Sequence, residues 1–236
     1  MANRNSIKHV LFDLDETMYP TETGIMDLIG ERINEYMSVR LGIEPDEVAS
    51  LRSRYYERYG TTGRGLYLHH DVDLADYFEF VHDLPVEEVL QPDARLDEML
   101  DSLEVEKAIF TNATAEHAQR VLRALRVQRH FGCIIGIAEL EYIPKPDVRA
   151  YHRALELLRA RPQECLLVDD RARNLSPGHD LGMTTVLVGG PLPGEKPDFV
   201  IRWVGELGEL MLRIESGAAW NAEPAQEPRH ECGQAV

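Results

Sequence analysis

Acidic, hydroxyl and amine side chains follow the ends of four apolar segments, where they could act together on a charged substrate. The first of these segments, "VLF", runs into "DLDET", and the second, "AIF", runs into "TNA". The third segment is followed by "PKPD", and the fourth segment ends in "VDD". The chemically useful side chains there are Asp13, Asp15, Thr111, Asn112, Lys145, Asp169 and Asp170.

Clustered carboxylates need a cation to offset their mutual repulsion. Two carboxylates about 4 Å apart repel by about 1 kcal/mol in water and by about 4 kcal/mol at an effective dielectric constant of about 20. The candidate ligands Asp13, Asp15 and Asp170 offer only oxygens, with no histidine or thiol accompanying them. Because oxygen ligands suit a hard cation, we expect Mg²⁺ as the cofactor.

The same set of side chains matches what transfer from a phosphate ester requires. Such a reaction needs a nucleophile, positive charge near the transferring oxygens and a proton for the leaving group. Carboxylates can provide the nucleophile and the proton, while Lys145 and the cation can provide the charge. A small phosphate ester is therefore the expected partner.

The elements that must position these residues form a repeated strand and helix pattern. Apolar runs over 7–15, 107–113, 133–138, 164–170 and 184–189 predict buried strands. Helical spacing of apolar residues over 114–127 and 145–160 lies between the later strands. Alternating strands and helices predict an α/β fold with a doubly wound parallel sheet. The carboxyl ends of its strands would share one edge, where ligands bind.

About ninety residues separate the first two predicted strands, far more than a crossover needs. The intervening stretches 24–42, 44–60 and 73–85 carry apolar residues at helical spacing, and Pro45 suits the first turn of a helix. We expect residues 1–17 and 99–216 to form the α/β core and residues 18–98 to form a helical cap. The small and polar residues 217–236 predict a disordered tail.

Four motifs in this order resemble those of the haloacid dehalogenase superfamily. They are "DLDET", "FTNA", "PKPD" and "VDD", and the resemblance covers nearly all of residues 7–190. It implies a Rossmann-like core with an inserted helical cap of the type called C1. One departure is Arg171, which stands after the last acidic pair where many members carry a small residue.

The resemblance also implies a role for each matching residue. Asp13 would attack phosphorus to give an aspartyl phosphate, and Asp15 would act as acid and then base. Thr111, Asn112 and Lys145 would hold the phosphate. Mg²⁺ would be bound by Asp13, the Asp15 carbonyl and Asp170, and by Asp169 through water.

Within the superfamily, the cap resembles that of the pyrimidine 5′-nucleotidase branch. The similar stretches are 54–66, "RYYERYGTTGRGL", and 76–85, "DYFEFVHDLP". We interpret the first as a tyrosine-rich helix that runs into a glycine loop. The resemblance implies hydrolysis of UMP and CMP, with Arg64, Tyr67 and Tyr19 as substrate-binding candidates.

Other functions stay open at this point. Another small phosphate ester, such as a sugar phosphate or a lysophospholipid, could be the substrate, and a phosphomutase would keep both aspartates. A receiver-like signalling module shares the sheet and the residue types, although such modules lack a large insert after the first strand.

Composition narrows the partners and the setting. The chain has 236 residues and a formal net charge of −16, so a nucleic acid polymer or an anionic membrane surface is a poor partner. The three cysteines, Cys133, Cys165 and Cys232, do not form a disulfide framework. No stretch reads as a signal peptide or a membrane span, so we expect a cytoplasmic protein.

Overall fold

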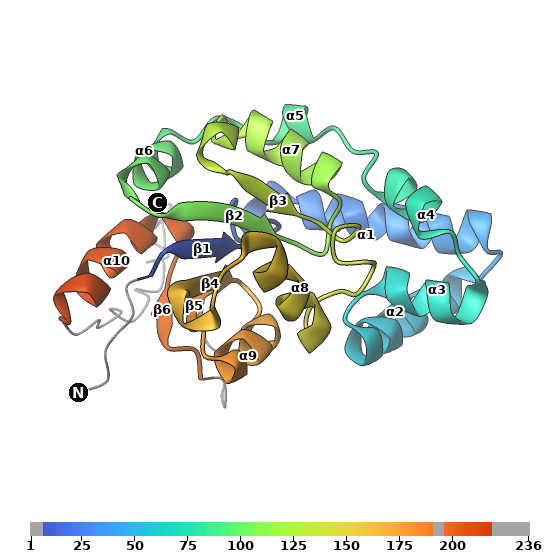
Figure 1. Cartoon of the computed structure of the whole chain (residues 1–236). Helices are drawn as coiled ribbons and strands as arrows, with labels where there is room; N and C mark the ends of the chain where they lie inside the picture. Colours follow the sequence, from blue (N-terminus) through green and yellow to red (C-terminus); the bar gives the residue numbers. More distant parts are fainter. Residues whose placement is uncertain (1–6, 191–195, 219–236) are drawn as a thin grey trace, which may run out of the picture.

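A parallel sheet places the predicted motifs side by side. The computed structural model describes residues 7–190 and 196–218. In this part of the chain, six strands are ordered β3-β2-β1-β4-β5-β6, and every pair is parallel (Figure 1). The strands are β1 (His9–Phe12), β2 (Glu106–Phe110), β3 (Cys133–Ile135), β4 (Cys165–Asp169), β5 (Thr184–Val188) and β6 (Phe199–Ile201). The predicted α/β class is confirmed.

The strands form where apolar residues can be buried on both faces of the sheet. In β1, Val10 and Phe12 join one buried cluster while Leu11 joins the other, and all three are fully buried. Burial on both faces explains why these segments are continuous apolar runs in the sequence. Because β1 lies between β2 and β4, the residues after β1 face neighbours from both halves of the sheet.

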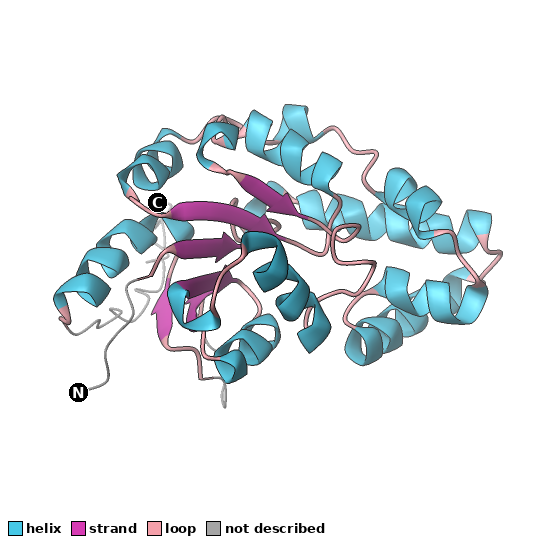
Figure 2. Ribbon diagram, viewed as in Figure 1, coloured by secondary structure: helices cyan, strands magenta, loops and turns pink. Residues whose placement is uncertain are grey.

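Helices cover both faces of the sheet (Figure 2). Residues of α6 (Ala94–Ser102), α7 (Ala115–Ala124) and α10 (Leu207–Ser216) belong to the larger buried cluster. Residues of α8 (Val148–Leu158) and α9 (Ala172–Leu181) belong to the cluster on the opposite face. Short 3₁₀ turns occur at Thr21–Thr23, Gln128–His130, Pro162–Glu164 and Val204–Glu206.

The long insertion after β1 is helical, and much of it has a core of its own. It contains α1 (Ile25–Glu35), a π-helical turn (Tyr36–Arg40), α2 (Pro45–Tyr59), α3 (Thr62–His70), α4 (Leu74–Val81) and α5 (Val86–Val89). A third buried cluster joins the π-helical turn to α2, α3 and α4, through residues such as Met37, Leu66 and Phe78. Pro45 begins α2, where its missing N–H costs no hydrogen bond.

Helices α5 and α6 pack on the sheet side of the molecule. Val86, Leu96 and Leu100 belong to the same buried cluster as the β1 residues Val10 and Phe12. The predicted boundary of the cap at 98 stays a prediction, since Ile25 and Ile29 of α1 belong to the same cluster as these residues. The predicted disordered tail, 217–236, lies outside the described residues from position 219 onwards.

One local expectation was wrong, and one strand was missed. The glycine loop predicted near Arg64 is helix α3, which begins after the Thr61 side chain accepts a hydrogen bond from the Arg64 backbone N–H. Its glycines permit close packing, because a Cβ at Gly63 or Gly65 would lie 2.6 Å or 2.2 Å from a tyrosine ring atom. The short edge strand β6 was not predicted.

None of the helices within residues 7–190 and 196–218 is long and apolar enough to cross a membrane.

Candidate active site

The ends of β1 and β4 bring three carboxylates together. The Asp13 backbone N–H donates to the Val168 carbonyl at 2.8 Å, which aligns the residues that follow β1 with the end of β4. Carboxylate oxygens of Asp13, Asp169 and Asp170 all lie within 4.8 Å of one another. Asp13 and Asp170 of the predicted cluster therefore lie together at the carboxyl edge of the sheet, and the third carboxylate of the group belongs to Asp169 instead of Asp15.

Lys145 is buried between two of these carboxylates. Its Nζ donates to Asp13 Oδ1 at 2.8 Å and to Asp169 Oδ2 at 2.7 Å, and the residue is only 1% exposed. Asn112 fixes its backbone: the Asn112 Oδ1 accepts from the Lys145 N–H at 2.8 Å, and the Asn112 Nδ2 donates to the Lys145 carbonyl at 3.1 Å. Asn112 thus positions the lysine through its side chain.

The cluster is short of positive charge despite Lys145. Burial raises the pKa of Asp13 well above its usual value, and the attraction of Lys145 only partly opposes this. Burial and the neighbouring Asp169 raise the pKa of Asp170 to about 7, although Arg171 Nε contacts Asp170 Oδ2 at 2.7 Å. Crowded oxygen donors that resist ionisation fit a hard divalent cation.

Asp15 has a different set of neighbours. Tyr19 Oη donates to Asp15 Oδ1 at 2.5 Å, and His117 Nε2 lies 3.3 Å from the same oxygen. Burial opposes ionisation of Asp15, but the hydrogen bonds and charge of His117, together with Tyr19, lower its pKa overall. His82 stacks on His117 with ring centroids 4.4 Å apart. Asp15 Oδ1 is therefore held by Tyr19 and His117.

Thr111 follows β2 and is also buried. Its hydroxyl accepts from the Ala113 N–H at 3.0 Å, and its own N–H donates to the Ile135 carbonyl at 3.0 Å. Thr111, Asn112 and Ala113 line the same cavity as the two motif aspartates Asp13 and Asp15. These groups could therefore contact the oxygens of a phosphate bound there.

A cavity of about 410 Å³ lies between this edge of the sheet and the cap. Its volume falls within the range of about 300–1,000 Å³ that is common for small-molecule sites. The cap contributes polar and aromatic side chains, and these are Arg52, Tyr56, Thr62, Tyr77, Phe78 and His82. The cavity can therefore hold a small ester whose phosphate faces the acidic cluster.

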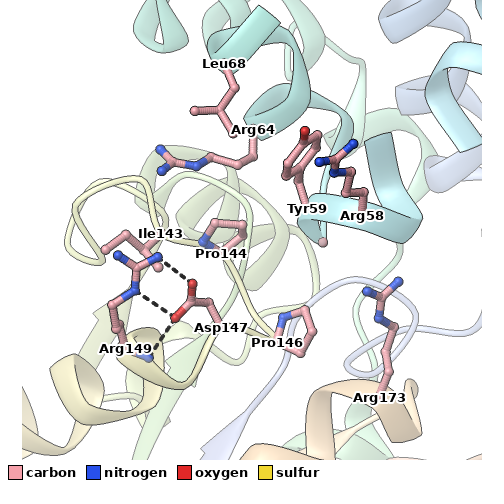
Figure 3. Close-up of a pocket in the computed structure, with 11 residues that line it drawn as sticks. Arg58, Tyr59, Arg64, Leu68, Ile143, Pro144, Pro146, Asp147, Arg149 and Arg173 are labelled. Carbon is pink, nitrogen blue, oxygen red and sulfur yellow. Dashed lines mark hydrogen bonds and ion pairs between the residues drawn. The ribbon is translucent and has the colours of Figure 1, made fainter. Parts of the chain in front are cut away.

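The three predicted substrate-binding residues do not line this cavity. Tyr19 is buried and holds Asp15. Arg64 lies on α3 and lines a different cavity, beside the loop at Ile143 and Pro144 (Figure 3). Tyr67 is 46% exposed and lies near the Arg64 guanidinium. The helical turn of α3 explains the difference, because it turns Thr62 and Gly63 toward the catalytic cavity and carries Arg64 away from it.

Several residues around the site were missed by sequence reasoning. His117 reaches Asp15 from α7, His82 stacks on His117 from the end of α4, and Arg52 comes from the middle of α2. No apolar strand precedes these residues, so the signal that revealed the other site residues is missing for them. Arg171, noted only as a departure, also bonds Glu16 Oε2 at 2.5 Å.

Similar proteins come from yeast and bacteria. "Phosphate metabolism protein 8" of Saccharomyces cerevisiae is 29% identical over 195 residues, which are 76% of this chain and 61% of that protein. This chain therefore spans less than two thirds of the yeast protein. "Pyrophosphatase PpaX" of Bacillus mycoides is 25% identical over 88% of this chain and 98% of its own length.

A solved structure and a family pattern also match this chain. The crystal structure of an HAD phosphatase from Thermococcus onnurineus superimposes with a TM-score of 0.60, at 24% identity, over 87% of this chain and 98% of that one. At this identity the likeness concerns the fold alone. The pattern of the haloacid dehalogenase-like hydrolases matches residues 7–182, and it includes every motif residue at the strand ends. The chain belongs to the haloacid dehalogenase-like hydrolase family.

Proposed function

We propose that this chain is a Mg²⁺-dependent phosphatase of small phosphate esters that works through an aspartyl phosphate at Asp13. The observation that carries the proposal is the buried Lys145 ammonium, which bridges Asp13 and Asp169 at 2.8 Å and 2.7 Å beside the cavity. Asp13 Oδ2 accepts only a long 3.5 Å contact from the Thr17 hydroxyl within the described residues. This oxygen is therefore the candidate nucleophile.

The reaction would take place in two steps. An oxygen of Asp13 attacks phosphorus, the bond from phosphorus to the ester oxygen breaks, and Asp15 gives its proton to the leaving oxygen. Water then attacks phosphorus and gives a proton to Asp15, and the bond from phosphorus to Asp13 breaks to release phosphate. Asp15 must be protonated first, and an incoming phosphate dianion would favour this because like charges raise a carboxyl pKa.

The cation would be held by Asp13 and Asp170, with the Asp15 carbonyl and Asp169 nearby, and would supply fixed positive charge to the phosphate oxygens. Thr111 and the Asn112 N–H would bind the remaining phosphate oxygens. Electrostatic stabilisation of this kind is the main protein contribution to phosphoryl transfer.

We propose pyrimidine nucleoside monophosphates, UMP and CMP, as the first substrates to test. Tyr56, Tyr77 and Phe78 line the cavity, and their aromatic faces suit a planar base. Sugar phosphates and lysophospholipids are alternatives, and the name of the Bacillus relative adds inorganic pyrophosphate. A phosphomutase is the other outcome for the same residues.

Phosphate release from a panel of these compounds tests the activity, with Asp13→Asn as the control. We expect Mg²⁺-dependent release by the native chain and none above background by the variant. The proposal would be refuted if the native chain released no more phosphate than the variant from any compound in the panel. Return of the phosphoryl group to a second sugar hydroxyl, without free phosphate, would identify a mutase instead.

A pair of tyrosine variants tests the role of the cavity in base recognition. Tyr56 lines the cavity, whereas Tyr67 is exposed outside it. We expect Tyr56→Ala to raise KM for UMP while leaving KM for an aryl phosphate nearly unchanged, and Tyr67→Ala to change neither. If Tyr67→Ala raised KM for UMP more than Tyr56→Ala did, the sequence-based prediction that Tyr67 binds substrate would be favoured instead.

A further inference from the structure

A second cavity lies at the junction between the cap and the α/β core (Figure 3), and Gly60 is the one described residue that lines both this cavity and the catalytic one. Its volume is about 330 Å³, at the lower end of the range of about 300–1,000 Å³ for small-molecule sites. Helices α2 and α3 of the cap form one side, and the core forms the other through the loop that contains Lys145 and the starts of α8 and α9. A ligand there would contact both parts of the molecule.

The second cavity concentrates positive charge in a strongly acidic chain. Four arginines line it, against the single carboxylate of Asp147, whereas the chain as a whole carries a formal net charge of −16. The arginines are Arg58, Arg64, Arg149 and Arg173. Figure 3 shows them on opposite sides of the opening, two on the cap and two on the core.

The two cap arginines are less engaged within the protein than the two core arginines. Arg149 is engaged with Asp147 through contacts of 2.9 Å and 2.6 Å. Arg58 and Arg64 make no salt bridge within residues 7–190 and 196–218, and each guanidinium lies 5.3 Å from the centre of a tyrosine ring. A guanidinium that forms no salt bridge is well suited to a phosphate group, which it can bind through two parallel hydrogen bonds.

The remaining walls of the second cavity are apolar. Leu68, Ile143, Pro144 and Pro146 lie among the arginines, and the Tyr59 ring stands beside Arg58. Apolar walls with a few convergent charged groups are typical of small-molecule sites. The combination favours a compact ligand with more than one anionic group over a broad macromolecular surface.

We propose that this cavity is a second, non-catalytic site for a small molecule with two or more phosphate groups, bound between the cap and core arginines. Nothing in the proposed phosphatase reaction requires the site, since Arg58 and Arg64 lie outside the catalytic cavity. The ligand class follows from the charge: one monovalent anion would satisfy a single guanidinium, whereas a bisphosphate can engage arginines on both sides.

The position of this second site connects it to the catalytic lysine. A Cβ at Gly60 would lie 2.6 Å from the Lys145 carbonyl oxygen, so the end of α2 rests directly on the backbone of that residue. Arg173 donates to the carbonyls of Tyr56 and Glu57 at 3.3 Å and 3.4 Å, which ties the core to the same end of α2. A ligand that bridges the arginines would therefore hold the cap against the loop of Lys145.

Calorimetric titration with methylenediphosphonate, a bisphosphonate that phosphatases do not hydrolyse, tests the site. EDTA in the buffer removes divalent cations, so the acidic catalytic cluster repels the anionic probe. Binding measured under these conditions therefore reflects the second cavity. We expect the double variant Arg58→Gln and Arg64→Gln to bind the probe more weakly, with a Kd raised by at least about tenfold. Arg54→Gln, on the same helix but outside the second cavity, should bind like the native chain.

Two results would overturn the proposal. One is the absence of binding by the native chain at millimolar probe, and the other is equal affinity in the double variant. Matching melting temperatures of the three proteins would establish that they are folded. Hydrogen exchange tests the bridging: amides of 58–66 and 143–149 should exchange more slowly with the probe bound, and unchanged rates on either side would contradict it.

Discussion

Lys145 is the residue on which the charge balance of the site depends. It is 1% exposed and bonded to carboxylates that follow two different strands. Loss of one partner from a buried ion pair leaves the other charge uncompensated, which costs about 3–5 kcal/mol. The same residue is therefore expected to matter for folding as well as for chemistry.

Replacement of Lys145 tests this double role. We expect Lys145→Met to lower the free energy of unfolding by about 3–5 kcal/mol in EDTA, measured by urea denaturation. Lys8→Met is the matched control, because the Lys8 side chain is 57% exposed in its 2.6 Å pair with Glu164 and should cost less than about 1 kcal/mol. Equal losses in the two variants would contradict a buried network.

His82 gives a pH dependence with a defined sign. Burial and the electrostatic effects of His117 and Arg120 lower its pKa to about 3, against the attraction of Asp15. Between about pH 6.5 and pH 3 the unfolded chain takes up a proton that the folded chain does not bind, so stability is lost as the pH falls. We expect His82→Gln to flatten this decline in urea denaturation from pH 7 to pH 4. Parallel curves for the two proteins would argue against a buried neutral histidine.

At this scale, sequence reasoning worked where a residue follows a buried strand. Asp13, Thr111 and Asp170 could be placed because parallel strands end at one edge. His117 could not, because it reaches Asp15 across 102 positions of the chain from a helix without any local signal. The predicted substrate-binding role of Arg64 stays a prediction, and the turn of α3 places Arg64 outside the cavity that Asp13 lines.

Among the elements, the junction between α2 and α3 shows how composition can mislead. Glycines at 60, 63 and 65 suggested a flexible loop, yet two of them lie inside α3 and admit the rings of Tyr77 and Tyr55. Tertiary packing decided the structure, which local propensity could not reveal. The three-residue strand β6 was also missed, although the equally short β3 was found within the apolar run 133–138.

Gly60 allows a test of the contact between cap and core. Its φ is +86° and a Cβ would lie 2.6 Å from the Lys145 carbonyl, whereas Gly42 has a φ of +65° with nothing within 4 Å. We expect Gly42→Ala to cost about 1–2 kcal/mol of unfolding free energy, from backbone strain alone. Gly60→Ala should cost more and also lower kcat, because α2 must move away from the catalytic loop. If the two variants lost the same unfolding free energy and Gly60→Ala kept its kcat, the contact of α2 with Lys145 would have no role in catalysis.

At the scale of the whole molecule, the catalytic cavity depends on both parts of the fold. The core supplies the carboxylates and Lys145, while the cap supplies the aromatic wall that covers them. Closure over such a site excludes water and completes the set of contacts. The sequence predicted both parts from the long insertion after the first strand, but the side chains at their meeting surface required the structure.

The central claim, that Asp13 receives the phosphoryl group, can be tested directly. Acid quench during turnover followed by borohydride reduction converts an aspartyl phosphate to homoserine, which peptide mass spectrometry can locate. With Mg²⁺ and a hydrolysed substrate, we predict homoserine at position 13 and at no other aspartate. Turnover that leaves Asp13 unmodified, or homoserine at Asp15 or Asp170 instead, would contradict the account.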